Sequence, residues 1–227
     1  LTSSTSPFSI VNIFSPFIDI YKAVLEMPTV MWQLFLVYLF QWYAMMCYWQ
    51  NNSKSIALSV WNVTPKDVMG YEKAVEWNGL IGAFGFIVTF SIAFYLAKLA
   101  KKHGAKMIHF ACLLFGAISF LWFPTIQNQY VFFAVIIGYG IAWASMMGIP
   151  YLMVVAVIPK ERYGVYMGII NMMIVIPMII QNLSFGYILK NFLDNDPRQA
   201  ISFAGVLLML AAICTLLIKI KNTKVSE

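Results

Sequence analysis

The sequence predicts an all-α membrane protein built as a bundle of six transmembrane helices. Hydrophobic residues make up 61% of the 227 positions and charged residues only 11%, whereas soluble domains average about 45–50% apolar and about 25% charged residues. Six apolar stretches come close to the ~20 residues that a membrane-spanning helix needs, and none alternates as a half-buried strand would. The six stretches cover residues 30–50, 79–99, 108–124, 130–158, 164–189 and 201–218.

The basic residues predict the orientation of the bundle, because cytoplasmic loops of membrane proteins carry an excess of Lys and Arg. Successive spans place ten basic residues on one side and five on the other. The first side holds Lys22, Lys98, Lys101, Lys102, Lys106, Lys160, Arg162, Lys219, Lys221 and Lys224. The second side holds Lys54, Lys66, Lys73, Lys190 and Arg198. We therefore expect a multi-pass protein of the cell (inner) membrane with both ends in the cytoplasm, and no binding of nucleic acid.

The segments outside the bundle are short. We expect residues 1–28 to form a cytoplasmic tail with a short amphipathic helix, residues 29–221 the bundle, and residues 222–227 a second cytoplasmic tail. The apolar face of the amphipathic helix would hold Phe17, Ile20, Tyr21, Val24 and Leu25. The longest connection, after the first span, is expected to fold partly as helix. The chain begins at Leu1 without a visible signal peptide, and we expect it to be a piece of a longer protein.

Several chemistries find no support in the residues. No Asp, Glu, Lys or Arg lies in the interior of a predicted span, and such residues are the usual proton or ion relays of membrane proteins. The chain shows no catalytic constellation, so we do not expect an enzyme. Cys47, Cys112 and Cys214 have no metal-ligand spacing to the histidines, so no metal or cofactor is expected. His103 and His109 are expected to be solvated, because they flank one loop.

The fifth span carries a stripe of small and polar residues. At about 100° per residue, seven positions fall within about 60° of one another on one helix face. They are Gly164, Gly168, Asn171, Val175, Met178, Asn182 and Gly186. The glycine pair Gly164 and Gly168 would permit close helix approach, and Pro177 should kink the helix. Either the stripe is a packing face, or Asn171, with Gln181 or Asn182, faces a water-filled cavity.

The fourth and first spans carry aromatic and polar groups at mid-depth. One face of the fourth span is a small-residue stripe, which is typical of helix packing: Ala134, Gly138, Ala142, Ser145 and Ile149. Trp143 lies mid-span, whereas Trp usually lies at the membrane interface, so it is either core filler or a platform on which a sugar ring could stack. Gln41 and Trp42 of the first span are likewise too deep for an interfacial belt.

Four segments carry a family resemblance. They are "MPTVMWQLFLVYLFQWYAMMCYW" (27–49), "LAKLAKKHGAK" (96–106), "GIAWASMMGIPY" (140–151) and "GVYMGIINMMIVIP" (164–177). In this order they resemble the seventh helix, the basic loop between helices eight and nine, the tenth helix and the eleventh helix of major facilitator superfamily sugar transporters. Within that superfamily they are similar to the sucrose/maltose–proton symporters of the glycoside–pentoside–hexuronide:cation symporter type. Met178 departs from the family pattern, which has Gln at that position.

The resemblance implies that the chain is the C-terminal half of a twelve-helix major facilitator fold. Its partner would be an N-terminal six-helix bundle that carries the proton-coupling residues, and the substrate would be a neutral sugar bound between the two halves. The resemblance and the mid-span polar groups together give a set of candidate substrate-binding residues: Gln41, Trp42, Trp143, Ser145, Asn171 and Asn182. Pro150 and Pro177 are candidate helix kinks.

Two alternatives remain open at this point. On the same fold, the protein could be a facilitator or a sodium symporter for another neutral solute. In a different class, it could be a stand-alone six-span structural or regulatory subunit of the membrane.

Overall fold

The structure is a computed structural model that describes residue 18 and residues 20–219. Six long helices account for most of this part of the chain: α2 (Thr29–Ile56), α3 (Val68–His103), α4 (Ala105–Trp122), α5 (Phe132–Val155), α6 (Tyr163–Phe192) and α7 (Pro197–Leu216). All six are long and apolar enough to cross a membrane, and the described residues form no strand. The predicted fold class is confirmed.

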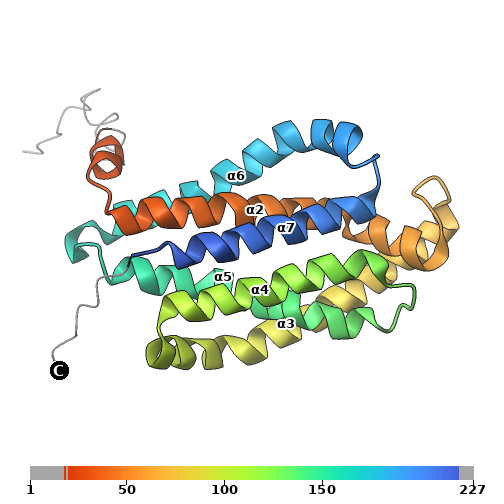
Figure 1. Cartoon of the computed structure of the whole chain (residues 1–227), viewed down its shortest axis with the longest axis horizontal. Coiled ribbons are helices and arrows are strands. Elements are labelled where there is room, and N and C mark those ends of the chain that lie inside the picture. Colours follow the sequence, from red (N-terminus) through yellow and green to blue (C-terminus); the bar gives the residue numbers. More distant parts are fainter. Residues whose placement is uncertain (1–17, 19, 220–227) are drawn as a thin grey trace, which may run out of the picture.

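Successive helices run in opposite directions along the bundle (Figure 1). The described basic residues of the predicted cytoplasmic side therefore lie at one end, where α2 begins and α7 ends; we call this end the basic pole. The opposite end, which we call the η1 pole, holds the π-helix η1 (Ala57–Trp61), the short 3-10 helix η2 (Phe123–Thr125) and the loop between α6 and α7. Which pole faces the cytoplasm stays a prediction.

Helix packing gives the bundle an open arrangement. The main packing partners follow the order α6, α2, α7, α4, α5 and α3, while α2 and α5 approach each other only weakly. The predicted small-residue face of the fourth span is confirmed as a packing face, because a Cβ at Gly138 would overlap Ser119 Oγ and the Phe115 carbonyl oxygen of α4. Small residues at such positions let helix backbones approach closely.

The helices at the two ends of this series, α3 and α6, are the least covered. Only 17% of the apolar window of α3 and 28% of that of α6 are buried, against 56% in α2. Within the described residues no helix closely approaches Gly164 or Gly168, since nothing from a neighbouring helix lies within 4 Å of a Cβ placed at either glycine, and the close approach that this pair would permit stays a prediction. The glycine face of α6 points away from the helix that α6 packs on, which is α2.

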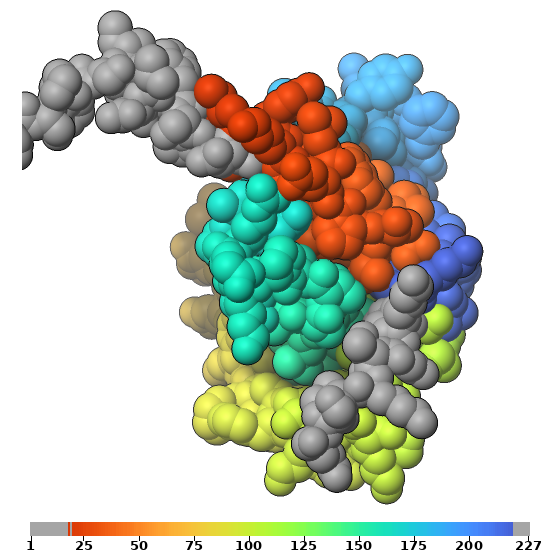
Figure 2. All heavy atoms as spheres, turned by 90° about the vertical axis from the view of Figure 1, so that its left-hand side faces the viewer, coloured from red at the N-terminus to blue at the C-terminus, as the bar shows by residue number. Residues whose placement is uncertain are grey.

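The segments around α2 extend its ends. Residues 20–25 are helical before α2, with Tyr21 and Leu25 exposed and Ala23 buried; Phe17 and the predicted tail at residues 222–227 lie outside the described residues. Figure 2 looks onto the basic pole and shows the segment that joins α5 to α6 against the start of α2, where Arg162 pairs with Glu26. Beyond α2 the chain continues as η1, so the first long connection is partly helical as predicted.

Candidate functional site

A cluster of aromatic rings fills the space between the middle of α2 and the middle of α5. The Trp143 ring stacks on Tyr139 at 6.2 Å with only 9° between their planes. The edges of two further indoles meet Trp143, with ring centroids 5.8 Å away for Trp42 and 5.5 Å away for Trp49. Trp42 also packs on Tyr38. We call these five residues the central aromatic cluster. Trp42 and Trp143 are both candidate substrate-binding residues from the sequence, and their rings are in contact in the structure.

The cluster is partly open. Trp49 is 36% exposed and Trp143 is half-buried, whereas Trp42 and Tyr139 are buried. An indole offers a flat apolar face and one N–H donor. The two accessible indoles therefore form a surface on which the apolar face of a ring-shaped solute could rest.

Unpartnered polar atoms accompany the cluster on α2. Tyr38, Gln41 and Trp42 are all buried. The Tyr38 hydroxyl, both amide atoms of Gln41 and the Trp42 indole N–H have no hydrogen-bond partner among the described residues. A buried polar atom left without a partner costs about 1–3 kcal/mol. Four such atoms within about one helical turn mark this part of α2 as the least satisfied polar region of the described core.

A second polar group joins α2 to α6 beside the cluster. Gln181 is fully buried and exchanges amide hydrogen bonds with Gln50, at 2.9 and 3.3 Å. Gln50 also donates to Asn182 Oδ1 at 3.0 Å, and the Tyr43 hydroxyl lies 2.8 Å from Ser184 Oγ. The predicted site residue Asn182 therefore belongs to an interhelical amide contact, as the packing interpretation of this span expects.

Ser145 lies in a different part of the bundle. It is fully buried, and its Oγ lies 2.8 Å from His109 Nδ1, which joins α5 to α4. The expectation that His109 is solvated is therefore wrong. Its helix begins four residues earlier, at Ala105, and the histidine faces the neighbouring helix instead of the loop. The structure thus places Ser145 in an α4–α5 contact, apart from Trp143, its near neighbour in sequence.

The remaining predicted residues are Asn171 of α6 and the two candidate kink residues, Pro150 and Pro177. Asn171 is exposed, on the uncovered face of α6, and no hydrogen bond of its side chain is found among the described residues. Pro150 and Pro177 lie inside α5 and α6, and α6 diverges from α2 only toward its C-terminal end (Figure 1), since Gln181 and Ser184 still contact α2 beyond Pro177. The structure therefore brings Trp42 and Trp143 together, and leaves Asn171 and Asn182 on separate parts of α6.

Three members of the site lie outside the candidate set that the sequence gives: Trp49, Gln50 and Tyr139. A signal for Gln50 was present, because α2 and α6 run in the same direction and Gln50 and Gln181 lie at comparable distances from the starts of their helices. Polar residues at matching depth on parallel spans are candidates for an interhelical hydrogen bond.

The chemistry of this region is neutral. The Asp, Glu, Lys and Arg residues of the described helices lie toward the helix ends, and no three His, Cys, Asp or Glu side chains of this part of the chain gather as a metal site would require. Indole, phenol and amide groups remain, which bind an uncharged solute by ring contact and hydrogen bonding.

A bundle of six long apolar helices with an uncharged interior defines a multi-pass integral membrane protein. The family model of the Major Facilitator Superfamily matches residues 3–182, and the chain belongs to this superfamily of membrane transporters. No curated protein and no solved structure matches the chain. The six helices fit one half of a major facilitator fold.

Proposed function

We propose that the chain is the C-terminal half of a secondary active transporter that takes up a neutral disaccharide or glycoside, such as sucrose or maltose, together with protons. Transport would proceed by alternating access, with two six-helix bundles rocking about a site between them. The basic pole would face the cytoplasm, and the η1 pole the outside of the cell.

The central aromatic cluster carries this proposal. Its two accessible indoles, Trp49 and Trp143, suit the apolar face of a sugar ring. The unpartnered amide of Gln41 and the indole N–H of Trp42 suit sugar hydroxyls, which both donate and accept hydrogen bonds. The Asp, Glu, Lys and Arg residues of the described helices lie toward the helix ends, so the groups that line this cluster are neutral, as suits an uncharged solute.

The uncovered faces of α3 and α6 support a partner bundle. Both helices are the least buried of the six, and α6 exposes Asn171 together with two glycines. Lipid alone would leave the Asn171 amide without hydrogen bonds, which is costly in hydrocarbon. We therefore place the N-terminal bundle, or the water-filled space between the bundles, against this face.

Uptake measurements test the proposal. Cells that lack other routes for the sugar would express the complete protein and be given labelled sucrose or maltose at acidic and at alkaline external pH. We expect faster uptake at acidic pH and its loss when a protonophore removes the proton gradient. Sugar uptake that ignores pH but requires Na⁺ would favour a sodium symporter, and no uptake of either sugar would contradict the proposal.

The variant Asn171→Leu tests the role of the exposed face of α6. We expect it to insert into the membrane normally and to reduce uptake, because Leu removes the amide without adding bulk. Val175→Leu is the matched control, since Val175 lies one turn further along the same exposed stripe and is 50% exposed. Normal uptake by Asn171→Leu would show that Asn171 has no part in transport.

A further inference from the structure

A pocket of about 460 Å³ lies at the η1 pole, outside the central aromatic cluster. Small-molecule sites are clefts of about 300–1,000 Å³, so a solute the size of a disaccharide fits within it. One wall comes from the end of α2 and the loop after η1, and the other from the end of α6 and the loop to α7. The lining residues that the argument uses are Asn51, Lys54, Thr64, Asp194, Asn195 and Asp196.

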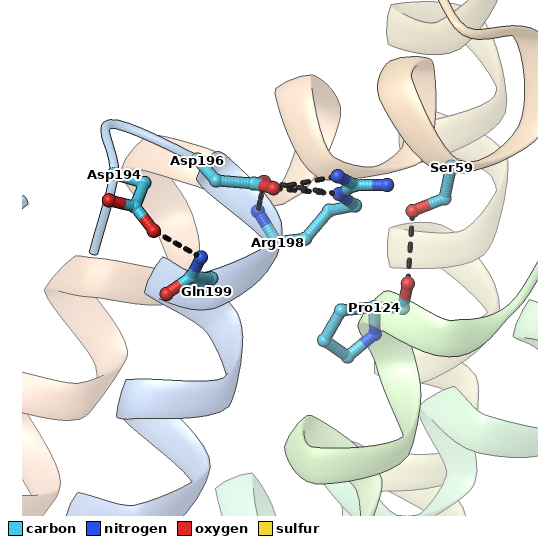
Figure 3. A network of polar contacts seen from close by, with 6 residues as sticks. All are labelled: Ser59, Pro124, Asp194, Asp196, Arg198 and Gln199. Atoms are coloured by element: carbon cyan, nitrogen blue, oxygen red, sulfur yellow. Dashed lines mark hydrogen bonds and ion pairs between the residues drawn. The ribbon is translucent and has the colours of Figure 1, made fainter.

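Hydrogen bonds hold the second wall in place. Asp194 and Asn195 both adopt the left-handed backbone region, with φ of 50° and 56°, which Asn and Asp tolerate better than most residues. The backbone N–H of Asn195 donates to the Leu189 carbonyl oxygen at 2.8 Å. The side-chain Nε2 of Gln199 donates to Asp194 Oδ2 at 3.4 Å (Figure 3). This wall of the pocket is therefore formed before any ligand arrives.

The opposite wall is anchored to the bundle at two points. The Ser59 hydroxyl donates to the Pro124 carbonyl oxygen at 3.2 Å (Figure 3), which ties η1 to the end of α4. Asn51, at the end of α2, is 97% buried and its Nδ2 donates to the Cys47 carbonyl at 2.9 Å. Its Oδ1 accepts no hydrogen bond from the described residues. A fixed amide with a free acceptor thus lines the pocket.

The charges of the lining balance one another. The Asp196 carboxylate is already paired with Arg198. It accepts a hydrogen bond from the Arg198 backbone N–H at 2.7 Å and from the Arg198 guanidinium at 2.7 Å (Figure 3). Lys54 is positive and Asp194 negative, so the pocket has no net charge to offer an ion. Between the polar groups lie Leu58, Val63, Pro65, Leu189 and Pro197, which suit the C–H faces of a sugar.

From this geometry we propose that the pocket at the η1 pole is a second binding site for a neutral polyhydroxylated solute, separate from the central aromatic cluster. Its ligand class rests on the proposed function. The site would hold the sugar at the mouth of the bundle by hydrogen bonds to Asn51, Thr64 and Asp194, before the sugar reaches the central cluster.

Protection of Lys54 from chemical labelling tests this site directly. The complete protein in lipid nanodiscs exposes both poles to an amine-reactive reagent, and mass spectrometry follows each lysine with and without sucrose, maltose or sorbitol. Sugar at about ten times its dissociation constant fills about nine-tenths of the sites, so labelling of Lys54 should slow about tenfold. Lys66, exposed at the same pole but outside the pocket, should react at an unchanged rate. Equal labelling of Lys54 with and without all three solutes would overturn the proposal.

Two variants separate this site from the central cluster. Thr64→Val removes a lining hydroxyl and should weaken the protection of Lys54, whereas the matched change Thr125→Val, outside the pocket at the same pole, should not. Trp143→Ala should stop uptake while Lys54 remains protected. Protection that disappears with Trp143→Ala would mean that Lys54 reports the central cluster, which overturns the second site. Protection without any sugar uptake would contradict the proposed transport function and leave the pocket standing.

Discussion

Gln41 and Gln181 have the same side chain and both are fully buried, yet their surroundings differ in kind. Gln181 exchanges hydrogen bonds with Gln50 of the neighbouring helix, and its Nε2 also lies 3.7 Å from Cys47 Sγ. Gln41 has no partner for either amide atom among the described residues. In a bilayer the first arrangement joins two helices, and the second leaves donor and acceptor unused at a cost in stability.

This difference distinguishes a glutamine with a structural role, Gln181 of α6, from a candidate binding residue, Gln41 of α2. A paired amide is explained by the helix contact that it makes. An unpaired one, next to Tyr38 and Trp42 in the same condition, is explained if a ligand or a second conformation satisfies it. From the sequence Gln41 is a candidate binding residue and the role of Gln181 is open; the structure gives hydrogen-bond partners to Gln181 alone, and the binding role of Gln41 stays a prediction.

Among the variants that compare these two glutamines, Gln41→Leu should have the largest effect, and it should act on transport. A hydrogen bond to a ligand contributes about 0.5–1.5 kcal/mol, and 1.4 kcal/mol is tenfold in affinity, so sugar uptake at low concentration should fall by about twofold to tenfold. Folding should not suffer, because Leu of similar size removes two unpartnered polar atoms. Uptake and thermal unfolding in detergent would be measured on the same preparation. A variant that unfolds at lower temperature but transports normally would make Gln41 a structural residue.

Gln181→Leu should show the reverse pattern. Hydrogen bonds between transmembrane helices contribute about 0.6 kcal/mol on average and up to about 1.7 kcal/mol, so we expect a loss of stability of about 1 kcal/mol. The double-mutant cycle with Gln50→Leu isolates the amide pair, since once Gln181 is replaced Gln50→Leu should lose only the bond to Asn182. Additive losses in the cycle would show that the two amides do not stabilise each other.

The sequence was sufficient for the fold because bilayer thickness sets the length of an apolar helix, and all six spans are helices. It was less informative about where helices end. The second span was predicted at residues 79–99, but α3 starts at Val68. Asp67 caps that end by accepting from the Gly70 N–H at 3.2 Å, and Glu72 and Lys73 then continue the helix outside the apolar window. Hydropathy locates the apolar part of a helix that suits the bilayer, but it does not locate the residue at which the helical hydrogen bonds begin.

The site was predictable only in part, because helical periodicity says which residues share a face but not which helix that face meets. Trp42 and Trp143 were selected as mid-span aromatics, and their rings are in contact in the structure, while their binding role stays a prediction. Ser145 was selected by depth, but the helix facing it is α4 with His109. The stripe of Asn171 was interpreted from its phase alone, and the structure leaves Asn171 exposed while Asn182 of the same stripe contacts α2.

The smallest expected effect lies at the η1 pole, where a polar group is fully paired. Burial raises the pKa of Asp196, but the stronger combined effect of its hydrogen bonds and charge pairing with Arg198 holds that pKa below its usual value. Asp196 also caps α7 through the Arg198 N–H, and Asn is an equally good N-cap residue, so Asp196→Asn keeps the cap and removes the ion pair with Arg198. A partly exposed ion pair contributes about 0.2–1 kcal/mol. Asp196→Asn should therefore lower stability modestly.

The pH dependence of this variant identifies the cause. A carboxyl whose pKa is lowered by folding stabilises the protein fully above its unfolded pKa of about 3.9, and this contribution is lost as pH falls through the folded value. The stability difference between the protein and Asp196→Asn should thus be constant near neutral pH and shrink in acid below about pH 4. Gln199→Leu, which removes only the weaker contact to Asp194, serves as the control and should show no such trend. A difference that persists unchanged in acid would show that the ionised carboxylate and its pairing with Arg198 are not its cause.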